Sequence, residues 1–97
     1  MQMFNPPHPG EFIQTIYLEP FNLSIAAVAQ SLGIPSSQIN QLLNQEIGVN
    51  PELALRLSKS LGRSPESWLA MQNYYDLWQI QQTVDLSNVS SINFEAA

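Results

Sequence analysis

The residues of this chain that are best suited to specific hydrogen bonding are the amides and hydroxyls that cluster between Ser36 and Asn44. On a helix they would share one face and leave Ile39 and Leu42 on the other. Gln and Asn side chains can pair bidentately with adenine in the major groove, and Ser can donate or accept. The pattern therefore predicts a helix that reads base edges. Its candidate contacts are Ser36, Ser37, Gln38, Asn40, Gln41 and Asn44.

The charge balance argues against a general nucleic-acid binder. The net charge is −5, whereas such proteins usually have an electropositive surface. No charged residue occurs from Pro20 to Gln45, so the predicted reading helix would not repel phosphate. An ordinary solvated helix more often carries Glu and Lys. The neutral polar face therefore favours sequence reading over non-specific attraction.

Proline, glycine and capping residues divide the chain into five predicted helices. We expect the first over about Pro9–Leu18, with His8 near its cap and Pro20 ending it. The others run from Ser24 to Gly33, from Pro35 to about Asn44, from Asn50 to Gly62, and from Ser64 to about Gln82. The predicted fold is all-α: an extended leader (1–8), a five-helix domain (9–82), and a C-terminal tail (83–97) that is ordered only if something binds it.

The second and third helices have the features of a helix-turn-helix between about Ser24 and Asn44. Ala29 is small enough for a close crossing, and Gly33 can adopt the left-handed turn conformation. Aliphatic residues would fill the seam between the two helices. A plain helical hairpin with no role in DNA binding would share parts of this pattern. The seam residues are Val28, Leu32, Ile34, Ile39 and Leu42.

The fifth helix is apolar around most of its circumference. One stripe can face the core, and we expect Trp68, Leu69, Met71 and Tyr75 there. The remainder must be covered by another chain or stay exposed, and Trp and Tyr are common interface anchors. The candidates for contact with a dimer mate or another protein are Tyr74, Leu77, Trp78 and Ile80.

Other kinds of site find little support. His8 and Glu11 are too few ligands for a metal, and a helix-start role for His8 is favoured. No nucleophile–base pair, phosphate loop or catalytic carboxylate set is present, so neither an enzyme nor a cofactor is expected. The chain has no cysteine, no apolar run long enough to span a membrane, and no signal-peptide pattern at its start. We expect a soluble cytoplasmic protein with no membrane partner.

Several segments together resemble the HigA-type antitoxins, the VapI-like branch of the XRE, or lambda-repressor-like, helix-turn-helix family. The resemblance covers roughly Pro9 to Ile80. It is carried by Pro9-Gly10, Tyr17-Leu18-Glu19-Pro20, Leu23-Ser24, Val28-Ala29, Leu32-Gly33-Ile34, Pro51-Glu52-Leu53-Ala54-Leu55-Arg56-Leu57, Leu61-Gly62, Ser64-Pro65-Glu66-Ser67-Trp68-Leu69, Gln72-Asn73 and Tyr75-Asp76-Leu77.

The resemblance implies a lambda-repressor-like homodimer that neutralises a HigB-like toxin, an mRNA-cleaving ribonuclease of the RelE type. It also implies autorepression through a palindrome in double-stranded operator DNA. The family's recognition-helix positions fall on the amide and hydroxyl residues named above. The family often has a glycine and a basic residue just after this helix, where this chain has Gln45 and Glu46. Ser24 and Gln45 are candidate phosphate contacts, whereas Glu46 would repel phosphate.

Three cations, Arg56, Lys59 and Arg63, follow at positions i, i+3 and i+7. They could contact phosphate or toxin, but a solvated face with a Glu52–Arg56 pair is favoured. Two alternatives to the antitoxin remain. One is a solitary XRE-family repressor without a toxin, and the other is a protein-only interaction module that has lost DNA binding.

Overall fold

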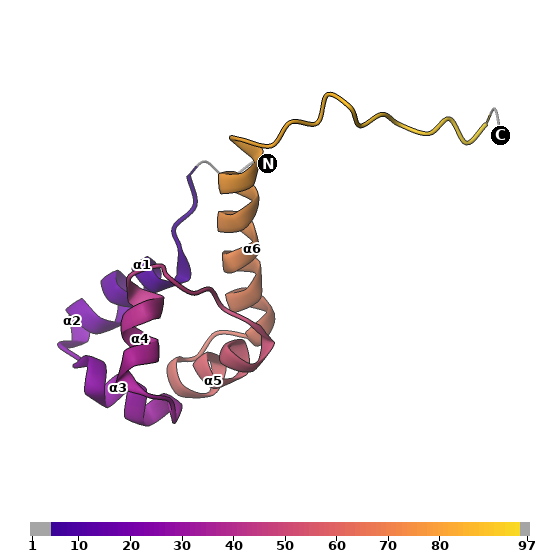
Figure 1. Cartoon of the computed structure of the whole chain (residues 1–97). Coiled ribbons are helices and arrows are strands. Elements are labelled where there is room, and N and C mark those ends of the chain that lie inside the picture. The colour runs from indigo at the N-terminus through magenta and orange to yellow at the C-terminus, as the bar shows by residue number, and fades with distance from the viewer. Residues whose placement is uncertain (1–4, 96–97) are drawn as a thin grey trace.

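The structure, a computed structural model, describes residues 5–95 (Figure 1). Five helical segments follow one another in this range, which contains no strand, and the predicted all-α, five-helix fold is confirmed. The first segment is continuous and comprises α1 (Pro9–Ile13), the π-helical η1 (Gln14–Leu18) and α2 (Glu19–Phe21). The other four are α3 (Ile25–Leu32), α4 (Ser36–Leu43), α5 (Pro51–Leu61) and α6 (Pro65–Gln81).

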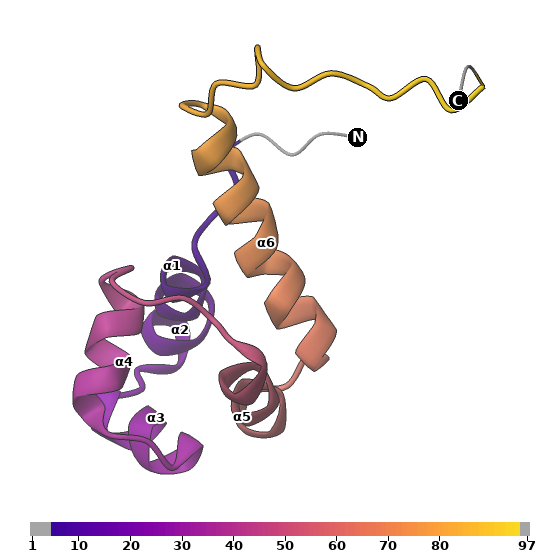
Figure 2. The ribbon, with the colours of Figure 1, turned by 45° about the vertical axis from the view of Figure 1, so that its right-hand side comes forward.

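The shorter helices form one group, and α6 extends from it (Figures 1 and 2). The chain after α6 continues away from the group in both views. The described molecule therefore measures 59 × 25 × 23 Å along its principal axes. None of the helices described in residues 5–95 is long and apolar enough to cross a membrane.

A single apolar core joins the helices. Trp68 of α6 is completely buried at its centre, and its indole N–H donates to the Gly62 carbonyl at 2.9 Å. Four of the five predicted seam residues are buried, and Ile34 packs half-buried against them. The buried apolar residues are Ile13, Leu18, Val28, Ala29, Leu32, Ile39, Leu42, Val49, Leu53, Ala54, Leu57 and Trp68.

Side-chain caps begin α3, α5 and α6 where the sequence predicts them, whereas α4 begins after Pro35 without a side-chain cap. The Ser24 hydroxyl accepts a hydrogen bond from the Ala27 N–H at 3.0 Å, and Ser64 caps α6 in the same way. The Asn50 side-chain oxygen accepts from the Leu53 N–H at 2.8 Å. Each cap satisfies a backbone donor that the first helical turn leaves unpaired.

The predicted end of the first helix at Pro20 is wrong. The helical backbone continues through Pro20 to Phe21, and Asn22, with φ of 53°, ends it. The reason is the π-helical turn before the proline, where the Glu19 N–H reaches back five residues to the Gln14 carbonyl. The ring of a proline collides with the carbonyl four residues earlier in a regular α-helix. A π turn is wider and accommodates the ring.

Candidate nucleic-acid interface

The outer face of α4 presents uncharged polar side chains to solvent. Five of the six predicted contact residues are exposed, while Ile39 and Leu42 on the inner face are each 1% exposed. The helical period thus separates a core face from a hydrogen-bonding face, as predicted from the spacing. The exposed residues are Ser36, Ser37, Asn40, Gln41 and Asn44.

Gln38, the sixth predicted residue, lies at the edge of this face. It is half-buried and lines a hollow of about 250 Å³ between α4 and α5. Glu52 and Arg56 of α5 line the same hollow. The side chain of Gln38 is therefore placed next to an ion pair of α5, apart from the five exposed residues.

The end of α4 explains why a glycine is common after such a helix. Gln45 has φ of 63°, in the left-handed region, and its N–H donates to the Leu42 carbonyl at 3.0 Å. The Glu46 N–H donates to the Gln41 carbonyl at 2.8 Å. This pair of bonds is a Schellman motif, in which glycine avoids the steric cost of a side chain. Here a glutamine takes that position.

The two candidate phosphate contacts both have intramolecular partners. The Gln45 side-chain oxygen accepts a hydrogen bond from the Tyr75 hydroxyl of α6 at 3.3 Å. The Ser24 hydroxyl is exposed but already caps α3. Glu46 is exposed beside Gln45, as the sequence led us to expect.

Helix α4 is supported from behind by α1. Gly10 of α1 is buried, and a Cβ at this position would overlap the carbonyl oxygen of Leu42. The backbones of α1 and α4 therefore approach more closely than any other residue would allow. His8 begins α1, and its Nδ1 accepts the Gly10 N–H at 2.9 Å, which confirms its helix-start role.

The loop after α4 is tied to α6 by Gln72, which the sequence did not single out as a structural residue. Gln72 is 8% exposed, and its side-chain oxygen accepts from the Val49 N–H at 2.8 Å. Its amide nitrogen donates to Asp76 at 3.0 Å. A Cβ on Gly48 would lie 2.8 Å from the Gln72 side chain, so a larger residue there would displace the Gln72 amide. The only sequence signal was the Gln72-Asn73 pair of the family resemblance.

Two of the three cations bind other parts of the chain. Arg56 pairs with Glu52 at 3.1 Å and donates to the Leu32 and Gly33 carbonyls at the end of α3, at 2.9 and 3.2 Å. Arg63 lies 5.0 Å from the centre of the Phe12 ring of α1. The Glu52–Arg56 pair agrees with the favoured interpretation of a solvated face. Arg56 also satisfies carbonyls that the end of α3 leaves unpaired.

The outer part of α6 is apolar and largely uncovered. Tyr74 is 51% exposed, Leu77 60% and Ile80 54%, while Trp78 is half-buried. Trp68 is in the core as predicted, and the other three predicted core residues, Leu69, Met71 and Tyr75, are half-buried. A soluble protein seldom exposes several large apolar side chains along one helix unless they bind something.

Comparisons with known proteins agree with this geometry. Residues 16–68 match the helix-turn-helix family. The chain is 37% identical to the uncharacterized HTH-type transcriptional regulator YddM of Escherichia coli (strain K12), over 92% of this chain and 94% of that protein. It is 38% identical to virulence-associated protein I of Dichelobacter nodosus, over 84% of this chain and 76% of that protein.

Solved antitoxin structures share the fold. Antitoxin GraA superposes with a TM-score of 0.82 at 33% identity, covering 94% of this chain and 98% of that one. GraA in complex with its operator superposes with a TM-score of 0.79 at 33% identity, covering 96% of this chain and 93% of that one. An addiction module antidote protein of the HigA family from Coxiella burnetii gives 0.84 at 27% identity, covering 93% and 100%. The chain therefore belongs to the XRE-type helix-turn-helix family, in the branch that includes HigA antitoxins and VapI-like proteins.

Proposed function

We propose that this protein is the antitoxin of a type II toxin–antitoxin system. It is a cytoplasmic homodimer that represses its own operon by binding a palindromic operator, and it neutralises a HigB-like, mRNA-cleaving toxin. The observation that carries the proposal is the exposed face of α4, which groups amides and hydroxyls without a charge. The GraA–operator complex, at 33% identity, supports a DNA-binding role for a face of this fold.

Base reading falls to the exposed residues of α4. Asn40 and Gln41 can each donate and accept in the plane of an adenine edge, and the shorter Ser side chains can bond to any base or to phosphate. Gln38 lies at the rim and contributes only if its side chain turns away from α5. Ser24 and Gln45 would bond to phosphate through groups left free by their intramolecular contacts.

A dimer is needed because a lone subunit attracts DNA weakly. The net charge is −5, and Glu46 lies just beyond the reading helix. Two α4 helices related by a two-fold axis can read two half-sites of a palindrome, which doubles the number of specific contacts. Specific hydrogen bonds then supply most of the affinity, because counterion release supplies little.

The outer side of α6 is the surface that we assign to protein contact. Apolar and aromatic side chains at the centre of an interface contribute most of its binding energy, and Lys and Glu are depleted there. The anchors are Tyr74, Leu77, Trp78 and Ile80.

A gel-shift titration of the protein's own promoter fragment tests DNA binding. We expect Asn40→Ala/Gln41→Ala to weaken binding by about 100-fold or more, since each bidentate contact discriminates by roughly 1–3 kcal/mol. The matched control is Gln30→Ala/Gln79→Ala, which removes exposed amides of α3 and α6 and should bind normally. If the unmodified protein fails to shift the fragment at low salt, alone and with its partner bound, the repressor role is wrong.

Co-purification with the product of the neighbouring gene tests the toxin partner. An antitoxin holds that product in a stable complex and suppresses its ribonuclease activity. If the product neither binds nor cleaves mRNA while the promoter shift is intact, the protein is a solitary repressor.

A further inference from the structure

The chain after α6 carries apolar side chains that its own domain does not cover. Every large apolar residue between Val84 and Phe94 is at least 43% exposed, and Phe94 is 80% exposed. In Figures 1 and 2 this tail, residues 83–95, runs away from the helices. A row of exposed apolar residues marks a binding segment. They are Val84, Leu86, Val89, Ile92 and Phe94.

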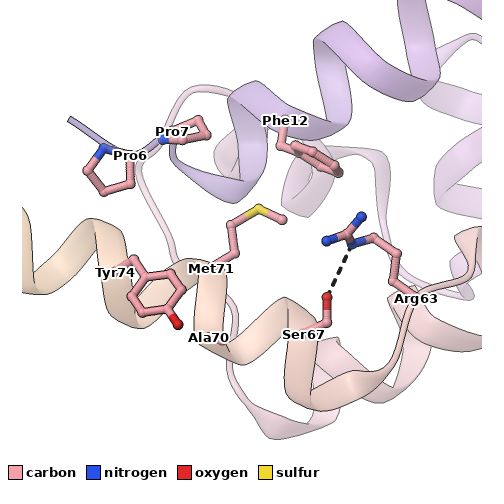
Figure 3. Close-up of a pocket in the computed structure, with 8 residues that line it drawn as sticks. All are labelled: Pro6, Pro7, Phe12, Arg63, Ser67, Ala70, Met71 and Tyr74. Carbon is pink, nitrogen blue, oxygen red and sulfur yellow. Dashed lines mark hydrogen bonds between the residues drawn. The ribbon is translucent and has the colours of Figure 1, made fainter. Parts of the chain in front are cut away.

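A matching hollow lies between Pro6 and Pro7, α1 and α6. It has a volume of about 300 Å³, and Phe12, Met71 and Tyr74 form much of its wall (Figure 3). Arg63 stands at one side, where its Nε donates to the Ser67 hydroxyl at 3.2 Å. Within residues 5–95, its two terminal nitrogens donate to no side chain or carbonyl. The hollow thus fits an apolar side chain accompanied by a carboxylate.

The tail has the complementary chemistry. Its charged residues are Asp85 and Glu95, both acids, and it contains no Lys or Arg. The hollow supplies a cation and an apolar wall in a protein whose net charge is −5. An acidic, apolar tail can therefore satisfy both features of the hollow at once.

The shape of the molecule favours a second copy as the source of the tail. Tyr74 belongs both to the hollow and to the exposed side of α6. If two copies pair these sides antiparallel, the end of one α6 lies beside the start of the other, where Ser67 and Ala70 line the hollow. A helix of 17 residues spans about 25 Å, so a tail would have to double back along its own helix to reach its own hollow.

We infer that two copies exchange tails, so that residues 83–95 of each dock in the α1–α6 hollow of the other. The inference rests on the proposed homodimer and adds to it the segment that closes the interface. The match to GraA bound to its operator covers 96% of this chain and so extends into the tail.

Mixed-label NMR on the full chain tests the exchange. The chain has no cysteine, so a spin label on Glu66→Cys, an exposed position beside Ser67, is unique. One copy in the mixture carries the spin label but no isotope, and the other carries the isotope but no spin label. We expect the spin label on the first copy to broaden the tail amide signals of the second. Broadening only when label and isotope share one chain would mean that the tail docks on its own domain and would overturn the inference, as would a dimer whose tail amides stay sharp.

A second variant pair checks the energetic contribution of the tail. Phe94→Asp should weaken dimerisation roughly tenfold or more, because burial of a Phe side chain is lost. Ser90→Asp places the same charge on an exposed polar tail residue and should leave the dimer unchanged. Equal effects of the two variants would overturn the inference. A protein that is monomeric at all concentrations would instead refute the dimer of the proposed function, and the exchange with it.

Discussion

The outward faces of α4 and α6 differ both in chemistry and in support. The α4 face is polar and uncharged, and α4 itself packs against α1 through the close approach of Gly10 to Leu42. The outer side of α6 is apolar, and the helix extends from the group of shorter helices (Figure 2). Reading a hydrogen-bond pattern requires donors and acceptors held in fixed positions, so rigid backing matters there. An apolar surface requires mainly a complementary partner.

The two faces are nevertheless joined by a small set of contacts. The Tyr75 hydroxyl bonds to Gln45 at the end of α4, and Gln72 holds the backbone of Val49 in the loop between α4 and α5. His8 packs edge-on against Tyr75, with ring centres 4.8 Å apart. Variants can therefore separate the two surfaces or loosen their junction.

The largest effect should come from charges on the outer side of α6. Tyr74→Asp/Leu77→Asp should weaken dimerisation by about 100-fold or more, since each buried large side chain contributes roughly 1.5–3 kcal/mol. Sedimentation equilibrium measures the change, and circular dichroism should still show a helical protein. Gln79→Asp, also exposed on α6, is the control. If the double variant dimerises normally, this surface is not part of the dimer interface.

Next in size is the support of α4. Gly10→Ala forces a methyl group against the Leu42 carbonyl, so α1 and α4 must move apart. We expect a loss of about 1–3 kcal/mol in the free energy of unfolding, typical of overpacking, and weaker promoter binding. Urea unfolding gives the stability, with Glu11→Ala on the exposed side of α1 as the reference. An unchanged midpoint would contradict the close packing.

The junction at Gln72 should contribute slightly less. Gln72→Leu keeps the apolar part of the side chain but leaves the Val49 N–H without its acceptor, at a cost of about 1–3 kcal/mol. Hydrogen exchange should show faster opening of the Val49 amide. Gln79→Leu, at an exposed position, should change neither quantity. Equal protection of Val49 in both variants would rule out the bond.

Relief of backbone strain after α4 should have a smaller, stabilising effect. Gln45→Gly removes the cost of a side chain at φ of 63°, about 1 kcal/mol, and loses one exposed hydrogen bond to Tyr75. We therefore expect the free energy of unfolding, measured by thermal unfolding, to rise by somewhat less than about 1 kcal/mol. Gln41→Gly, within α4 itself, should instead destabilise the protein. A loss of stability in Gln45→Gly would show that the Tyr75 bond outweighs the strain.

The smallest effect should be a pH dependence at His8. Burial lowers the pKa of His8 below its usual 6.5, against weaker opposing effects of the Asp76 carboxylate and the Ile47 carbonyl. The unfolded state therefore binds the proton more readily, so His8 favours folding above about pH 6.5 and opposes it increasingly as the pH falls below that value. Protonation also removes the acceptor for the Gly10 N–H. His8→Asn should reduce the change of melting temperature with pH between about pH 7 and 5.5. An equal slope in the variant and the unmodified protein would refute the effect.

Local rules predicted most of the helix boundaries and one face of the candidate site. The caps at Ser24, Asn50 and Ser64 depend on bonds within three residues, so the sequence reveals them. The outward position of Asn40 and Gln41 follows from the helical period alone. These features need no knowledge of how the helices pack.

The features that were missed depend on contacts between distant segments. The continuation of the first helix through Pro20 required a π turn that no residue type announces. Gln72 is polar, and its burial follows from a partner 23 residues away. Gln38 is half-buried and shares a hollow with Glu52 and Arg56 of α5, which are distant in the sequence. Periodicity places a residue on a face but does not show which neighbour covers the edge of that face.

The most direct test of the account is a comparison of Asn40→Ala/Gln41→Ala with the unmodified protein in two assays at once. One assay measures binding to the promoter fragment, and the other measures dimerisation and capture of the neighbouring gene product. We predict that the variant loses promoter binding by about 100-fold while dimerisation and capture stay normal, because the proposed function assigns DNA to α4 and protein partners to α6. A variant that binds the promoter normally, or that loses both activities together, would contradict this division.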